Sequence, residues 1–122
     1  FMHSGLTGVA EMVYNTPETG HVVVVMDNGT TAMTGLQEHP ATGRLLDGTP
    51  TDQIKIEDVA RAMGVAIVDV VDPLKETEEL QRRLKEAMAS GETALIVARR
   101  SCVLALKKAH RRSEEEGEAD AG

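Results

Sequence analysis

The sequence is poor in aromatic residues and in positive charge. Aromatics make up 2% of its 122 residues, and 13 Lys and Arg stand against 20 Asp and Glu, which gives a net charge of −7. Proteins that bind nucleic acids neutralise phosphates with clustered Lys and Arg, and those that bind single strands also stack bases on aromatic rings. This composition therefore argues against a nucleic-acid partner.

The chain also has a single cysteine, Cys102. One cysteine allows no internal disulfide framework, which fits a reducing cytoplasm. It cannot hold an iron–sulfur cluster, because such clusters take about four cysteines. The sequence shows no apolar run of membrane-spanning length and no signal pattern at its start. We therefore expect one cytoplasmic domain with a modest aliphatic core.

An unbroken apolar run opens residues 22–35, which read VVVVMDNGTTAMTG. Four valines and a methionine lead into Asp27-Asn28-Gly29, a pattern that predicts a strand buried on both faces and stopped by a turn. Such strands belong to parallel sheets, where ligands bind beyond the carboxyl ends of the strands. The turn offers oxygen ligands of the kind that Mg²⁺ takes beside substrate phosphates. The alternative is that Asp27-Asn28-Gly29 only forms a turn and binds nothing, since these residue types are common in turns.

Strand patterns alternate with helical patterns along the chain. Strands are predicted at residues 21–27, 65–71 and 93–98, and helices within residues 1–15, 54–63 and 73–90. This alternation implies βαβ units, so the predicted fold class is α/β, with a parallel sheet sandwiched by helices. Residues 37–51 lack periodicity and are interpreted as an active-site loop. In residues 107–122 the composition changes from basic residues to acidic and small residues, which predicts a disordered tail. The predicted domain therefore covers residues 1–106.

Several segments resemble a known family at its own order and spacing. They read DNGTTAMTG from Asp27, then Gln37, His39-Pro40 and Thr42-Gly43, with FMHSGL at the start, Val13-Tyr14-Asn15, and ARRSCVL from Ala98. Together they resemble the thiamine-diphosphate-binding region of the large (alpha) subunit of indolepyruvate:ferredoxin oxidoreductase. The resemblance runs from Phe1 to about Leu104, and its most specific block is TTAMTG.

The resemblance implies a cofactor, thiamine diphosphate, held through Mg²⁺. Carried over to this chain, Asn28 gives its side-chain oxygen to the metal and Thr30 its main-chain carbonyl. Thr31 and Met33 then line the thiazolium side of the cofactor. The family's iron–sulfur clusters belong to a partner chain or a further domain.

Two histidines are candidates for polar contact near the reacting centre. His3, Ser4 and Gly5 lie at the start of a predicted helix, whose amides attract anions such as a diphosphate. His39 lies in the 37–51 loop, and histidine is the usual general acid or base near neutral pH. The alternatives are an exposed histidine near the end of the chain for His3 and a solvent-facing loop residue for His39.

The chain departs from the family pattern at two places. The family carries Gly-Asp-Ser-Thr, with the main metal carboxylate, immediately before the segment that matches Phe1, and this chain begins after it. Leu36, Glu38 and Ala41 stand where Gly, Pro and Gly are expected. We therefore expect a domain that is incomplete at its N-terminus and needs a partner, either a second copy or the rest of an enzyme.

The function that the resemblance implies is oxidative decarboxylation of a 2-oxoacid, with indolepyruvate as first choice. Coenzyme A takes the acyl group, and electrons pass to iron–sulfur clusters and ferredoxin. Two alternatives stay open: a decarboxylase without the redox step, and a non-catalytic module that serves in subunit assembly.

Overall fold

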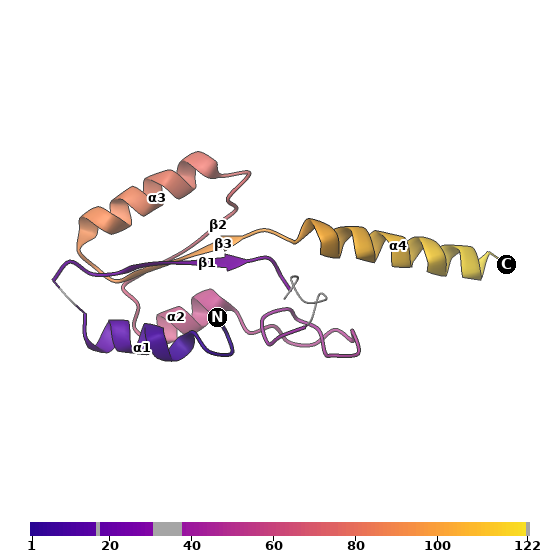
Figure 1. Cartoon of the computed structure of the whole chain (residues 1–122), viewed down its shortest axis with the longest axis horizontal. Helices are drawn as coiled ribbons and strands as arrows, with labels where there is room; N and C mark the ends of the chain where they lie inside the picture. The colour runs from indigo at the N-terminus through magenta and orange to yellow at the C-terminus, as the bar shows by residue number, and fades with distance from the viewer. Residues whose placement is uncertain (17, 31–37, 122) are drawn as a thin grey trace.

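The structure is a computed structural model that describes residues 1–16, 18–30 and 38–121. A three-stranded parallel sheet has helices on both faces (Figure 1). This arrangement confirms the predicted α/β class. The elements in chain order are α1 (Leu6–Tyr14), β1 (Val22–Asp27), α2 (Ile56–Ala62), β2 (Ile67–Val71), α3 (Thr77–Ser90), β3 (Ala94–Arg99) and α4 (Val103–Asp120).

The buried centre of the sheet is β3, not β1. The strand order is β1-β3-β2, and residues 94–98 are all buried. Among the described residues β1 pairs with β3 alone, and Val24 and Met26 on one of its faces are 44% and 86% exposed. The prediction that the 22–27 run is buried on both faces is therefore wrong for one face. An apolar run makes burial favourable, but the strands that pair with it decide its place in the sheet.

The main core lies between the sheet and helices α1 and α2. It is aliphatic, as the scarcity of aromatics predicts, and Phe1 and Met2 pack against it. This packing places the start of the chain beside the turn after β1. The buried members of the core are Val9, Val25, Ala41, Ile56, Ala60, Val65, Leu95 and Val97.

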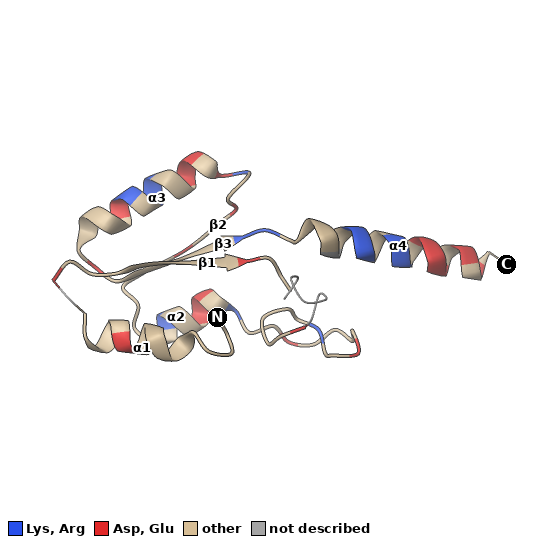
Figure 2. Ribbon diagram, in the orientation of Figure 1, with Lys and Arg blue, Asp and Glu red and all other residues tan. Residues whose placement is uncertain are grey.

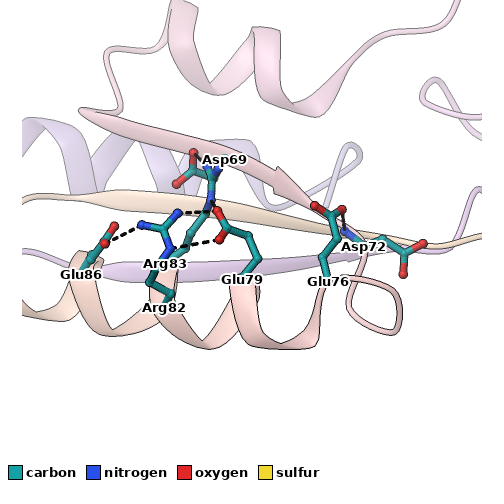
Figure 3. A network of polar contacts seen from close by, with 7 residues as sticks. All are labelled: Asp69, Asp72, Glu76, Glu79, Arg82, Arg83 and Glu86. Carbon is teal, nitrogen blue, oxygen red and sulfur yellow. Dashed lines mark hydrogen bonds and ion pairs between the residues drawn. The ribbon is translucent and has the colours of Figure 1, made fainter.

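Helix α3 covers the opposite face of the sheet (Figure 1). Its Arg83 pairs with Asp69 of β2, and Arg83 Nε also donates to Glu79 Oε1 at 2.6 Å (Figure 3). Asp69, the one carboxylate inside the β2 run, therefore ties a helix to the sheet. Gly91 ends α3 with a φ of 70°, the left-handed conformation that is typical of glycine after a helix.

Helix α4 projects away from the sheet, and the described side chains along it from Val103 onward are exposed (Figure 1). Its Lys and Arg residues come before its Glu residues along the helix (Figure 2). Most of the predicted tail, residues 107–122, lies within this helix. Charged and small residues mark a segment that cannot form a core of its own, but they do not forbid a helix, so the disorder of the tail stays a prediction. None of the helices in the described ranges is long and apolar enough to cross a membrane.

Candidate functional site

The turn after β1 is built by side chains that bond to its own backbone. Asp27 Oδ1 accepts a hydrogen bond from the Gly29 amide at 3.1 Å, and Asn28 Oδ1 accepts one from the Thr30 amide at 3.2 Å. Gly29 has a φ of 74°, a conformation that side-chain-bearing residues rarely adopt. The turn is therefore well defined, with Asp27 buried and Asn28 exposed beside it.

A cavity of about 330 Å³ opens at this turn, at the carboxyl end of β1. It brings together four of the residues that the sequence singled out, namely His3, Asn28, Thr30 and His39. Its other lining residues are Phe1, Met2, Val25, Met26, Asp27 and Ile56. The hollow thus lies where ligands bind in open α/β sheets.

The remaining predicted site residues either do not line the cavity or lie outside the described residues. Ser4 is exposed and Gly5 is the N-cap residue of α1, without a side-chain hydrogen bond at that cap. Neither is among the residues that line the cavity. Thr31 and Met33 lie outside the described residues.

His3 and His39 stand edge to face, with ring centroids 6.5 Å apart and an interplanar angle of 82°. His39 Nδ1 accepts a hydrogen bond from the Ala41 amide at 3.2 Å. A ring nitrogen that accepts a hydrogen bond carries no proton, so the neutral form of His39 has its proton on Nε2. Both histidines also line a second cavity of about 390 Å³, which they share with residues of the 38–54 loop.

The 38–54 loop, which contains the described part of the predicted 37–51 loop, is held together by hydrogen bonds within it. Gln53 Nε2 donates to the Ala41 carbonyl at 2.6 Å, and the Ile54 amide donates to the Pro40 carbonyl at 3.0 Å. Arg44 and Pro50 form an isolated antiparallel bridge inside it. These bonds hold His39 at the boundary between the two cavities.

Beside the turn, Arg99 joins two carboxylates from distant parts of the chain. Its Nε lies 2.8 Å from Asp27 Oδ2, and its Nη1 and Nη2 lie 3.0 and 2.7 Å from the two oxygens of Glu57. The hydrogen bond from Arg99 holds the pKa of Glu57 below its usual value, against the opposing effect of burial. No pattern in the sequence pointed to Glu57 as a partner of Arg99, because the two residues lie 42 positions apart in the chain.

The donor set fits a magnesium ion that is bound mainly through a ligand's phosphates. Within the described ranges no group of three His, Cys, Asp or Glu side chains can hold a metal. Both oxygens of Asp27 already accept hydrogen bonds, whereas from the part of the chain that the structure describes Asn28 Oδ1 accepts one of the two that an amide oxygen can take. Mg²⁺ commonly keeps few protein ligands beside phosphate oxygens, so Asn28 and the Thr30 carbonyl suit it as a partial shell.

Residues 1–98 match the family described as thiamine pyrophosphate enzyme, C-terminal TPP binding domain. The indolepyruvate oxidoreductase subunit IorA of Pyrococcus horikoshii is 45% identical over 106 residues, which cover 85% of this chain and 15% of that protein. The IorA subunit of Archaeoglobus fulgidus is 36% identical over 112 residues, which cover 92% of this chain and 18% of that protein. This chain thus spans less than a fifth of the length of these relatives. No solved structure matches it significantly.

Proposed function

Because the chain belongs to the C-terminal TPP-binding domain family of thiamine pyrophosphate enzymes, we propose that it forms the Mg²⁺- and diphosphate-binding part of a 2-oxoacid oxidoreductase. Relatives named indolepyruvate oxidoreductase subunit support this class, with indolepyruvate as first choice of substrate. The observation that carries the proposal is the cavity at the carboxyl end of β1, where Asn28, Thr30 and His3 come together.

The metal ligands in this proposal are Asn28 through its side-chain oxygen and Thr30 through its main-chain carbonyl. The rest of the shell comes from the diphosphate and from a carboxylate outside this chain's described residues. The amides at the start of α1 favour the negative charge of a diphosphate. In this role the segment His3-Ser4-Gly5 contacts the phosphates, while Thr31 and Met33 line the thiazolium side.

The bound cofactor supplies the carbanion chemistry that releases carbon dioxide from a 2-oxoacid. The chain's own part is to bind, orient and exchange protons. His39 keeps Nε2 as its exchangeable position, since Nδ1 is engaged by the Ala41 amide. His3 stands edge to face with it, so the pair offers polar contact to substrate at the rim of both cavities.

The electrons of the oxidative step leave through iron–sulfur clusters on other domains or subunits, and then through ferredoxin. Coenzyme A takes the acyl group in the same assembly. The length of the curated relatives supports the presence of such further parts, because this chain covers 15% to 18% of them. The proposed location is the cytoplasm.

The proposal is tested by calorimetric titration of thiamine diphosphate with Mg²⁺ into the chain in its native assembly. We expect saturable, Mg²⁺-dependent binding, and loss of most of the heat in Asn28→Ala. The matched control is Asn15→Ala, because Asn15 is an exposed asparagine at the far end of α1. Equal binding by Asn28→Ala and the parent would remove Asn28 as a metal ligand.

Product analysis on the same protein separates the proposed reaction from its alternatives. An oxidoreductase forms acyl-coenzyme A and reduces ferredoxin, whereas a plain decarboxylase releases an aldehyde and reduces nothing. Absence of thiamine diphosphate binding in the intact assembly would instead support a module that serves only in subunit assembly.

A further inference from the structure

Asp27, which lines the cavity at the end of β1, belongs to a three-residue charge cluster with Glu57 and Arg99, which we call the Arg99 cluster. The three residues come from the end of β1, the first turn of α2 and the end of β3. The side chains of Asp27 and Glu57 are 5% and 12% exposed, and that of Arg99 is 35% exposed. Two nearly buried carboxylates therefore depend on one guanidinium.

The geometry of the cluster depends on the planar guanidinium of arginine and its several N–H donors. Two parallel bonds run from the guanidinium to Glu57, and a third runs from Nε to Asp27. A planar fork can make all three at once, while a lysine ammonium is a single point charge on a flexible stem. Losing Arg99 would leave two carboxylates largely buried without their common partner.

The cluster bears directly on the turn that carries the proposed metal ligands. The Asp27 carboxylate bonds to Arg99 with one oxygen and to the Gly29 amide with the other. The next residues of the Arg99 strand hold the backbone of the same turn, since the Arg100 amide donates to the Asp27 carbonyl at 2.9 Å and the Cys102 amide to the Asn28 carbonyl at 3.0 Å. Asn28 thus leaves the sheet from a point fixed through both backbone and side chain.

We propose that Arg99 is a positioning residue, which sets the Asn28–Thr30 turn for the metal–diphosphate ligand by holding Asp27 against Glu57. This inference rests on the proposed function of the cavity. Arg99 also offsets negative charge at a place that must accept a diphosphate, because without it the Asp27 and Glu57 carboxylates would repel the phosphates. With Arg99 present, both carboxylate oxygens of Asp27 are engaged by the protein, so the proposed ligands are the neutral Asn28 side-chain oxygen and the Thr30 carbonyl.

The test compares Arg99→Met with Arg100→Met in the native assembly. Arg100 is the control, because it is the next residue along the chain and also pairs with a carboxylate, that of Asp72 at 3.2 Å. Its amide, which bonds to Asp27, is unchanged by the substitution. The measured quantities are the Kd of thiamine diphosphate at saturating Mg²⁺, the thermal unfolding midpoint, and the electron paramagnetic resonance spectrum of Mn²⁺ bound in place of Mg²⁺.

We expect Arg99→Met to weaken cofactor affinity about 10- to 100-fold, the range seen when groups that orient metal ligands are removed. The Mn²⁺ spectrum should change in the same variant, since the turn then offers its oxygens in a different arrangement. Arg99→Lys should restore part of the affinity by restoring the charge, and Arg100→Met should bind like the parent.

Two outcomes would overturn the inference while leaving the proposed function standing. One is an Arg99→Met protein that melts earlier but keeps the parental Kd and Mn²⁺ spectrum, because Arg99 would then serve stability alone. The other is an equal loss of affinity in Arg100→Met. Failure of the parent protein itself to bind thiamine diphosphate would instead refute the proposed function and this inference with it.

If Arg99→Met does not fold, Asp27→Asn carries the same test. Asparagine keeps the shape of Asp27 and its oxygen for the Gly29 amide, but lacks the charge that binds Arg99. Weaker cofactor binding by folded Asp27→Asn supports the positioning role. Parental affinity would show that the contact between Asp27 and Arg99 does not set the turn.

Discussion

Neighbouring polar residues at the end of β1 do different work. Asp27 is 7% exposed, and each of its two carboxylate oxygens accepts a hydrogen bond from another part of the protein. Asn28 is exposed at the rim of the cavity. A carboxylate is usually the stronger ligand for Mg²⁺. In the proposed site, the burial of Asp27 against Arg99 leaves the side-chain oxygen of Asn28 as the better-placed ligand for the metal.

The ionisation of the single residue Glu57 makes the free energy of unfolding depend on pH. Its pKa is held below the ordinary 4.5 chiefly by the hydrogen bond from Arg99. A lowered carboxyl pKa adds stability that is present above the unfolded-state pKa and is lost as the pH falls toward the folded-state pKa. The free energy of unfolding of the parent should therefore exceed that of Glu57→Gln near pH 7, and the difference should shrink at about pH 4.

Urea denaturation of both proteins at the two pH values measures this difference. Glu118→Gln is the matched control, because Glu118 is exposed on α4 and far from the Arg99 cluster. A gap between the parent and Glu57→Gln that stays constant with pH would contradict the assignment of Glu57 as a charged partner of Arg99.

Among the elements, β3 carries most of the burial. It is hydrogen-bonded along both edges, and its side chains reach the core shared with α1 and α2 on one face and the α3 side on the other. It also ends in Arg99 and leads into the Arg100–Cys102 segment that holds the turn after β1. The strand that the core depends on therefore also supports the cavity.

The same substitution in two elements tests this role of β3. Leu95 is 1% exposed in β3, and Leu104 is 62% exposed in α4. Leu95→Ala should lower the free energy of unfolding by about 2–5 kcal/mol, through lost burial and the cavity it leaves. Leu104→Ala should change it by no more than about 0.5 kcal/mol, as exposed substitutions do.

Denaturant titration of the two variants measures both values. Similar losses in the two would mean that α4 is packed against something in solution and that β3 is not the dominant buried element. A loss confined to Leu95→Ala would agree with the burial described above.

The whole molecule is a packed α/β layer with one helix that stands apart from it (Figure 1). Along α4, Lys107 and Lys108 come before Glu114, Glu115 and Glu116 (Figure 2). This order opposes the helix dipole, which favours acidic residues near the start and basic residues near the end. In proteins most of the stability of a helix comes from tertiary packing of one face, and the described side chains of α4 are exposed.

We therefore predict a boundary in local stability between the 1–106 domain and residues 107–122. Amide hydrogen exchange in α4 should be fast, with opening free energies close to zero, whereas amides of β3 should exchange only through opening of the domain. Mass spectrometry of peptides after deuterium labelling distinguishes the two segments. Slow exchange in both would refute the boundary and indicate that α4 is stabilised by a partner.

Much of the architecture follows from the sequence alone. The periodicity of apolar residues, which reflects local backbone geometry, predicted three strands and three of the helices near their observed bounds. The sequence also predicted the turn after β1, because Asp, Asn and Gly favour such a turn through their own side chains and backbone. The resemblance to a known family selected His3, Asn28, Thr30 and His39, which the fold brings to one cavity, while their roles stay predictions.

Tertiary structure alone decided which strand is central and which charges pair. The order β1-β3-β2 places the last strand between the other two, and no local pattern encodes that crossover. Arg99 meets Asp27 and Glu57 across 72 and 42 positions of the chain. Contacts at such separations depend on how whole elements pack. The carboxylate of Asp27, one of the oxygen groups that the turn offers in the sequence, is therefore engaged in the fold by Arg99.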